Sequence, residues 1–166
     1  TCTVTLPPER DVVAPSVARA LEPAEGPARL PIDVHDAPPS LRTIRVLVAD
    51  DHRLLREGVV GQLGLDPSIE VVGEAEDGEQ AVAKALQLRP DVVVMDVSMP
   101  GVDGIEATRR IANHRPDIAV VGLSMHDDRT VAAEMRAAGA VAYLTKDGTA
   151  DELLSTILAI RDDSPR

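Results

Sequence analysis

The stretch that decides the fold reads PDVVVMDVSMPGVDG and covers residues 90–104. Its first half is a short apolar run, Val92–Met95, which ends at Asp96. Its second half contains Pro100 and Gly101, which are common residues of turns. A short apolar run that stops at charged and turn residues is typical of a strand buried on both faces of a sheet.

Four more apolar runs of this kind occur in the chain, and segments with a helical period separate them. Strand and helix alternate five times, which favours right-handed crossovers and a parallel sheet with helices on both faces. We therefore predict an α/β fold, a (βα)5 doubly wound domain at about 43–162. The four runs are Ile44–Ala49, Ile69–Val72, Ile118–Leu123 and Val141–Leu144.

Local patterns indicate where the predicted helices begin and end. Asp77 and Gln80 have the spacing of a capping box, and so do Thr149 and Glu152. Gly139 follows a segment of helical period and predicts a helix stop. The apolar face expected for the first helix consists of Leu54, Leu55, Val59 and Leu63.

Composition limits the classes of function. The net charge of −11 over 166 residues argues against binding to nucleic acids or anionic membranes, which needs clustered Lys and Arg. The single cysteine, Cys2, excludes a disulfide framework and fits a reducing compartment. No apolar run approaches the ~20 residues that span a bilayer, and the start of the chain does not resemble a signal peptide. We expect a cytoplasmic segment, whether or not a parent protein is anchored in a membrane.

Residues 1–42 have a different composition, with eight of the 13 prolines. Such a segment cannot bury enough apolar surface to fold alone, so we predict a mostly disordered linker at 8–42. Residues 1–7 alternate polar and apolar side chains and predict a strand, which needs a sheet to join. The chain starts at Thr1 without a Met, and we expect a piece of a longer protein. Residues 163–166 are interpreted as a tail.

Polar side chains follow the predicted strands at the edge where open parallel sheets bind ligands. Asp50 and Asp51 follow the first run, and Asp96 follows the third. Three carboxylates repel one another unless a cation joins them, and Mg2+ prefers such oxygen ligands. Asp96 could then attack phosphorus and form an acyl phosphate. Ser124 and Lys146, after the fourth and fifth strands, would pair with the phosphoryl oxygens.

Further short motifs accompany this carboxylate cluster. The block Asp-x-x-Met-Pro-Gly-x-Asp-Gly begins at Asp96, and together the motifs resemble the receiver domain of bacterial response regulators over about 43–162. The resemblance is closest to the subgroup joined to a helix-turn-helix output domain, and it implies a flavodoxin-like sheet with strand order 2-1-3-4-5. The other motifs are VLVADDH at 46–52, EDG at 76–78, LSM at 123–125, AGA at 138–140 and YLTK at 143–146.

The resemblance implies a role for each residue of the cluster. By position, Asp96 is similar to the phosphorylated aspartate, and Asp50 and Asp51 to the acidic pair that binds Mg2+. Ser98 would add its backbone carbonyl to the metal. Lys146 is similar to the invariant lysine of the family.

The resemblance also implies residues that switch and residues that tune. Ser124 is similar to the switch hydroxyl and Tyr143 to the aromatic side chain that turns inward with it. Ser98 and His126 lie where the family tunes the lifetime of the phosphoryl group. The chain departs from the family at Asp147. Many receivers have a proline at this position, joined to the preceding lysine by a cis peptide bond. A cis bond before a non-proline residue costs ~3 kcal/mol, so we expect a trans bond here.

A receiver of this family accepts a phosphoryl group from a histidine kinase or a phosphotransfer domain and acts on an output domain or a downstream protein. Phosphorylation would change the face formed by the fourth helix, the fifth strand and the fifth helix. A phosphorylation-dependent dimer is expected through that face or through the first and fifth helices. We do not expect an enzyme beyond self-phosphorylation and self-dephosphorylation, nor direct binding of nucleic acids.

The first residues indicate the setting. Thr1–Pro7 resembles the last strand of the ATP-binding domain of sensor histidine kinases, which commonly ends in Thr-x-Val-x-Leu-Pro. Followed by a Pro-rich linker and a receiver, it favours the C-terminal receiver of a hybrid histidine kinase. The alternative is the receiver of a free-standing DNA-binding regulator without its output domain. The segment itself has no kinase glycine boxes and no phospho-donor histidine motif.

Other site classes fit less well. A dinucleotide-binding fold would have Gly-x-Gly-x-x-Gly after the first strand. A cobalamin site would have glycine where Leu55 stands. A Mg2+-dependent phosphohydrolase with Asp96 as nucleophile remains an alternative, although the dehalogenase type would have Asp in place of Ser98. A degenerate receiver that serves only as a binding surface is a further alternative. It fits less well, because all residues of the expected phosphorylation site are present.

Overall fold

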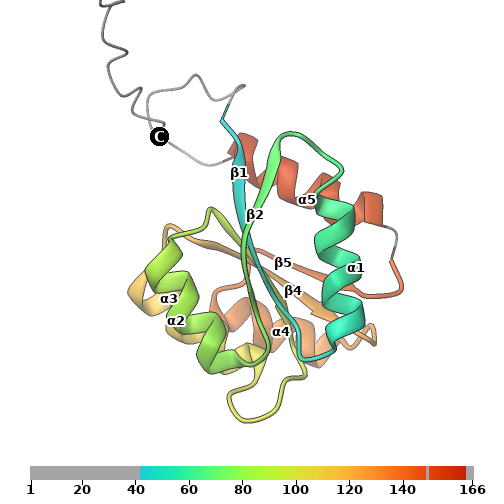
Figure 1. Cartoon of the computed structure of the whole chain (residues 1–166). Coiled ribbons are helices and arrows are strands. Elements are labelled where there is room, and N and C mark those ends of the chain that lie inside the picture. Colours follow the sequence, from blue (N-terminus) through green and yellow to red (C-terminus); the bar gives the residue numbers. More distant parts are fainter. Residues whose placement is uncertain (1–41, 149, 164–166) are drawn as a thin grey trace, which may run out of the picture. The chain divides into compact units, whose positions relative to one another are not determined.

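Strands and helices alternate strictly along the chain in the computed structural model, which describes residues 42–148 and 150–163 (Figure 1). The prediction of five strand–helix units is confirmed. No helix of the described residues is long and apolar enough to cross a membrane. The elements are β1 (Ile44–Ala49), α1 (Arg53–Leu63), β2 (Ile69–Ala75), α2 (Gly78–Leu88), β3 (Val92–Asp96), α3 (Gly104–His114), β4 (Ala119–Ser124), α4 (Arg129–Ala138), β5 (Ala142–Thr145) and α5 (Ala150–Asp163).

The five strands form one parallel sheet in the order β2-β1-β3-β4-β5, as predicted. The chain begins the sheet at β1, adds β2 on one side, and then crosses to place β3 on the other side of β1. Figure 1 shows α1 and α5 on one face of the sheet and α2 and α3 on the opposite face. The order in which strands are added reverses between β1 and β3, and this switch point leaves a crevice at their carboxyl ends, where ligands bind in such folds.

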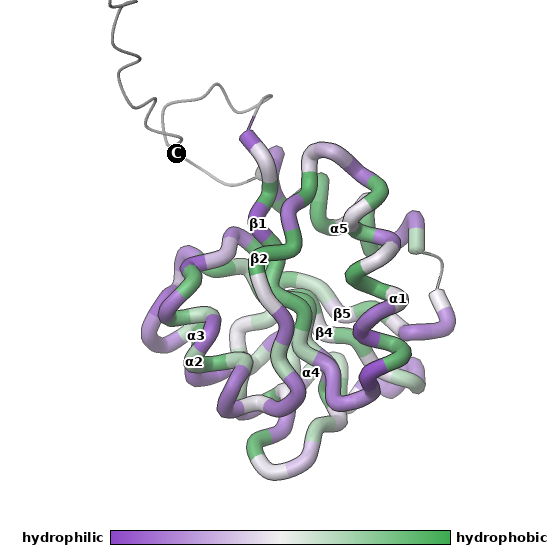
Figure 2. Tube along the Cα trace, in the orientation of Figure 1, coloured by the Kyte–Doolittle hydropathy of each residue, from purple (hydrophilic) through white to green (hydrophobic). Residues whose placement is uncertain are grey.

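The core consists of two layers, one on each face of the sheet, because successive strand residues point to opposite faces. In β1, Val46 and Val48 pack against the layer that includes Ile157 of α5. Leu47 and Ala49 pack into the layer under α2 and α3. The central strands β1, β3 and β4 are therefore apolar on both faces, and Figure 2 shows hydrophobic stretches along the sheet. This explains why the sequence shows continuous apolar runs rather than an alternating pattern.

The predicted helix ends are confirmed where the structure describes them. The Asp77 side chain accepts a hydrogen bond from the Gln80 backbone N–H at 2.7 Å at the start of α2. Gly139 ends α4 with a φ of 114°, a left-handed conformation that favours glycine. All peptide bonds of the described residues are trans, including the one before Asp147, as predicted. Thr149 of the second capping box, and the calls on 1–41 and 164–166, lie outside the described residues.

The prediction for the apolar face of α1 is wrong at Leu54 and Leu55, which are 82% and 39% exposed. The inward positions of α1 are Arg56, Val59 and Leu63, which recur three and four residues apart. Leu54 lies two residues before Arg56 and therefore about 200° away around the helix axis. The inward position in the first turn belongs to a buried arginine, which the pattern of apolar residues alone did not indicate.

Candidate functional site

The carboxyl ends of the strands bring the predicted site residues to one edge of the sheet. The register pairs Asp96 of β3 with Leu123 of β4, so that Ser124 ends β4 one residue further on. Ser124 in turn pairs with the last residue of β5, and its carbonyl accepts the Lys146 N–H at 2.7 Å. Asp50 follows β1, the other neighbour of β3. The strand ends therefore place these four residues side by side.

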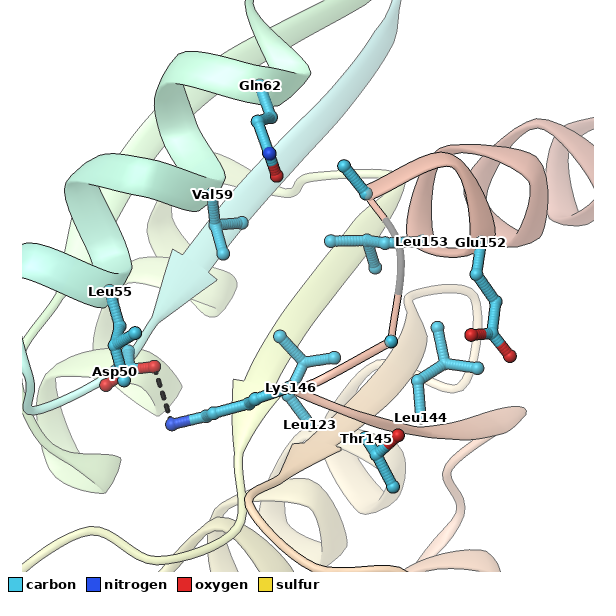
Figure 3. Close-up of a pocket in the computed structure, with 12 residues that line it drawn as sticks. Asp50, Leu55, Val59, Gln62, Leu123, Leu144, Thr145, Lys146, Glu152 and Leu153 are labelled. Carbon is cyan, nitrogen blue, oxygen red and sulfur yellow. Dashed lines mark ion pairs between the residues drawn. The ribbon is translucent and has the colours of Figure 1, made fainter.

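Lys146 forms two buried ion pairs at the centre of this edge. Its Nζ lies 2.7 Å from Asp50 Oδ2 and 2.9 Å from Asp96 Oδ2, and the Asp96 side chain is only 2% exposed. Figure 3 shows Lys146 reaching from the end of β5 to Asp50, beside a cavity of about 170 Å³ between α1 and α5. Apolar side chains such as Leu55 and Leu153 line this cavity. One ammonium thus holds two carboxylates in an environment with little water.

The pKa values of the central pair shift for opposite reasons. Burial raises the pKa of Asp96, and the bonds from Lys146 and the Ser98 N–H offset this effect only in part. Burial alone would lower the pKa of Lys146, but its contacts with Asp50 and Asp96 outweigh burial and raise it. Lys146 therefore stays charged at neutral pH, while the charge of Asp96 is only partly compensated.

Four neighbouring residues could hold a divalent cation at the exposed side of the Asp96–Lys146 ion pair. Asp50, Asp51, His52 and Asp96 each offer a ligand atom, and these atoms lie within 4.8 Å of one another. Three carboxylates face a single ammonium, so the cluster has an excess of negative charge. The three carboxylates supply the oxygen donors that suit Mg2+, and the half-buried Asp51 leaves room for the waters that Mg2+ retains. The residues therefore fit the predicted metal.

His52 belongs to this cluster although it was not among the predicted site residues. Its Nδ1 lies 3.0 Å from Asp51 Oδ1, and its backbone N–H donates to Asp50 Oδ1 at 2.8 Å. His52 directly follows Asp50 and Asp51 in the sequence, and this neighbouring position is the signal that could have identified it.

The loop after Asp96 is held close to this residue by the Asp-x-x-Met-Pro-Gly-x-Asp-Gly block. The Ser98 N–H donates to Asp96 Oδ1 at 3.1 Å. Gly104 donates its N–H to the Val97 carbonyl at 3.0 Å, and a Cβ on Gly104 would lie 2.0 Å from the Asp96 carbonyl oxygen. Asp103 caps α3 by accepting from the Glu106 N–H at 2.8 Å. The Asp103-Gly104 pair therefore lets α3 begin directly against the end of β3.

The predicted switch residues meet at the loop after β4. The Ser124 Oγ, which is buried, accepts from the His126 N–H at 3.3 Å. The Tyr143 hydroxyl donates to the His126 carbonyl at 2.8 Å. Both contacts of His126 come from its backbone. The predicted roles of the His126 side chain and of the Ser98 carbonyl stay predictions.

Arg56 was not among the predicted site residues. Its side chain is 7% exposed, and its Nη1 donates to the Asp50 carbonyl at 2.6 Å. Its other nitrogens contact Glu74 at 2.9 Å and Glu76 at 3.2 Å. Arg56 lies three residues before Val59 on the inward face of α1, and this spacing is the signal that could have identified it.

Comparisons with known proteins agree with this geometry. A family model for the response regulator receiver domain matches residues 46–158. The transcriptional regulatory protein DegU of Brevibacillus brevis is 42% identical over 117 residues, which cover 70% of this chain and 50% of that protein. The probable transcriptional regulatory protein NarL of Mycobacterium tuberculosis is 38% identical over 120 residues, covering 72% and 56%. The match therefore spans about half the length of these relatives.

Solved structures give the same result. The signal receiver domain of the putative response regulator NarL from Mycobacterium tuberculosis superimposes with a TM-score of 0.71 at 36% identity, covering 74% of this chain and 99% of that one. The response regulator domain of Thermotoga maritima CheB gives a TM-score of 0.70 at 35% identity, covering 75% and 100%. With its fold, the cluster around Asp96 and these relatives, the chain belongs to the response regulator receiver domain family.

Proposed function

We propose that this receiver accepts a phosphoryl group from a phosphohistidine onto Asp96, with Mg2+ held by Asp50, Asp51 and Asp96. The observation that supports this most strongly is the buried position of Asp96, 2.9 Å from an ammonium and within 4.8 Å of further carboxylate oxygens. A structural ion pair alone needs one carboxylate for one ammonium. The additional acids, the buried Asp50 and the half-exposed Asp51, support a site that takes up a cation and a phosphoryl group.

In the proposed reaction, a carboxylate oxygen of Asp96 attacks phosphorus and forms the acyl phosphate bond. The P–N bond of the phosphohistidine breaks, and its electron pair stays on the imidazole nitrogen of the donor, which takes up a proton from solvent. Bound Mg2+ would neutralise charge on the phosphoryl oxygens. Lys146, already 2.9 Å from the acceptor carboxylate, would pair with one phosphoryl oxygen. The Ser124 hydroxyl would pair with another.

The proposed output is a change in the face formed by α4, β5 and α5. Ser124 and Tyr143 both contact the backbone of His126, through its N–H and its carbonyl. When the Ser124 hydroxyl moves to the phosphoryl group, it would give up its contact with His126. The loop before α4 would then shift and release the Tyr143 hydroxyl, so that the ring turns inward. A dimer through this face, or through α1 and α5, would follow from that change.

Acetyl phosphate, a small phosphodonor, tests the proposal with the isolated chain. With Mg2+, intact-mass spectrometry should detect one acid-labile phosphoryl adduct, and Asp96→Asn should abolish it. Asp147→Asn, which changes an exposed acid beside Lys146, should keep the adduct. Absence of an adduct in the wild type would overturn the proposal. Continuous turnover of phosphoesters would instead support the alternative, a Mg2+-dependent phosphohydrolase with Asp96 as the nucleophile.

The setting of the receiver has two candidates. The resemblance of Thr1–Pro7 to a kinase strand favours the C-terminal receiver of a hybrid histidine kinase in the cytoplasm. The names of the relatives, which are transcriptional regulatory proteins, favour the receiver of a DNA-binding regulator. The coding sequence on either side of the segment decides between them: a kinase ATP-binding domain before Thr1 supports the first, and a DNA-binding domain after Arg166 supports the second.

A further inference from the structure

We infer that Arg56 is a positioning residue for the acidic pair, and that it sets the affinity of the site for a divalent cation by fixing the backbone between Asp50 and Asp51. The inference rests on the proposed function in one respect, namely that these two acids hold a cation. Arg56 belongs to α1 and would touch neither the cation nor the phosphoryl group. It would nevertheless control the geometry of the metal ligands.

The contacts of Arg56 explain how it would act. Its guanidinium is fixed by three oxygens: Glu74 Oε2 at 2.9 Å, Glu76 Oε1 at 3.2 Å and the Asp50 carbonyl at 2.6 Å. The planar fork of arginine holds several acceptors in fixed directions, which a flexible ammonium does not do. The two glutamates belong to the end of β2 and the loop after it. Arg56 therefore ties the loop after β1 to the neighbouring edge of the sheet.

The carbonyl that Arg56 holds belongs to the peptide group that joins Asp50 to Asp51. The peptide group before Asp50 is held separately, because the Asp50 N–H donates to the Ala75 carbonyl at 3.1 Å. The Asp50 side chain is fixed by Lys146 at 2.7 Å and by the His52 N–H at 2.8 Å. Arg56 thus holds this peptide group through its carbonyl, and the plane of the peptide sets the direction in which the side chain of the half-exposed Asp51 leaves the backbone.

Charge and position predict opposite effects when Arg56 is replaced, and this makes the inference testable. Arg56 is a cation close to an acidic cluster, so Coulomb repulsion alone predicts that its removal tightens the binding of a divalent cation. If Arg56 fixes the ligands, its removal weakens binding, because the metal must then order them itself. Loss of the partners that orient metal ligands typically costs 10–100-fold in metal affinity.

Calorimetric titration of the unphosphorylated chain with MgCl2 measures this effect without any phosphodonor. Arg56→Gln should raise the Kd for Mg2+ by about tenfold or more, and Arg56→Lys should restore part of the affinity. The matched control is Arg53→Gln, one turn earlier on the same helix, which removes an exposed guanidinium that pairs with Glu57. Its Kd should stay equal to that of the wild type or fall slightly.

A second measurement separates positioning from a loss of stability. In the metal-free protein, NMR should detect shifts of the Asp51 and His52 amide signals in Arg56→Gln but not in Arg53→Gln. Wild-type affinity in both Arg56 variants, or tighter binding, would overturn the inference, even if urea unfolding showed reduced stability. A wild-type chain that bound no Mg2+ would overturn the proposed metal role, and unmoved Asp51 and His52 amides would overturn the positioning role separately.

Discussion

Lys146 Nζ lies 2.9 Å from Asp96 Oδ2 in the interior of the site, and the pKa of each group is raised. The two shifts have opposite consequences for stability. A raised pKa favours the charged form of a lysine and the neutral form of a carboxylic acid. The charged form of Lys146 therefore stabilises the fold, whereas the charged form of Asp96 destabilises it. Substitution of each residue tests its contribution.

Asp96→Asn should raise the free energy of unfolding by about 1 kcal/mol at neutral pH in Mg2+-free buffer. Burial raises the folded-state pKa of Asp96 above its unfolded value, so the stability due to its protonated form is present at low pH and lost as pH rises through the folded pKa. The advantage of the variant should therefore shrink as pH falls below that value. Urea unfolding of both proteins across the acidic range checks this, and a variant less stable than wild type at neutral pH contradicts it.

Lys146→Met should lower the free energy of unfolding by about 3 kcal/mol, because it leaves two buried carboxylates without their cation. The folded-state pKa of Lys146 is raised, so its contribution is complete at neutral pH and is lost only as pH rises through that pKa. The double variant with Asp96→Asn should lose less than the roughly 2 kcal/mol that the two single effects give when they are added, since it leaves one buried carboxylate without its cation instead of two. Additive effects in this double-mutant cycle would show that the two side chains are not coupled.

Mg2+ at ten times its Kd should stabilise the wild-type chain by about 1.4 kcal/mol, since binding to the folded state alone shifts the equilibrium by mass action. Asp51→Asn should lose most of this gain, because it removes the half-exposed carboxylate of the cluster. Thermal unfolding with MgCl2 or EDTA measures the difference. Asp117→Asn, which changes an acid in the turn before β4, serves as the control and should keep the full gain.

Gly104→Ala should lower the free energy of unfolding by about 1–3 kcal/mol, because the new Cβ would lie 2.0 Å from the Asp96 carbonyl oxygen. It should also slow labelling by acetyl phosphate, since α3 must move away from the acceptor strand. Gly58→Ala in α1 is the matched control: its Cβ meets nothing within 4 Å, and the same change should stabilise the chain by about 0.5–1 kcal/mol. Equal effects of the two changes on unfolding would contradict the close approach at Gly104.

The central strands were predictable because burial on both faces leaves an unbroken apolar run. All five residues of β3 are buried, and the predicted run ends one residue before the strand does. The edge strand β2 was predicted only to Val72 but extends to Ala75, through the exposed Glu74. Its pairing with β1 also skips Val72, since Val46 pairs with Val71 and Leu47 with Gly73. An edge strand with one partly solvated face carries a weaker signal.

The site was predictable where it follows from chain order alone. Asp96 and Ser124 end buried strands, and Lys146 directly follows β5, so the order of the strands brings them together. Arg56 could not be identified in this way, because an arginine on a helix is usually solvated. It is buried because three oxygens from distant parts of the chain meet its guanidinium, and only the folded structure brings them there.

The hydrogen bond from the Tyr143 hydroxyl to the His126 carbonyl has a practical consequence for experiments. The chain contains no Trp and no Phe, and Tyr143 is its single aromatic residue apart from the histidines. Every tyrosine signal in near-ultraviolet absorbance, fluorescence or aromatic NMR therefore comes from one ring beside the candidate switch. The chain thus contains a built-in optical reporter, which can follow events at this loop in real time without any added label.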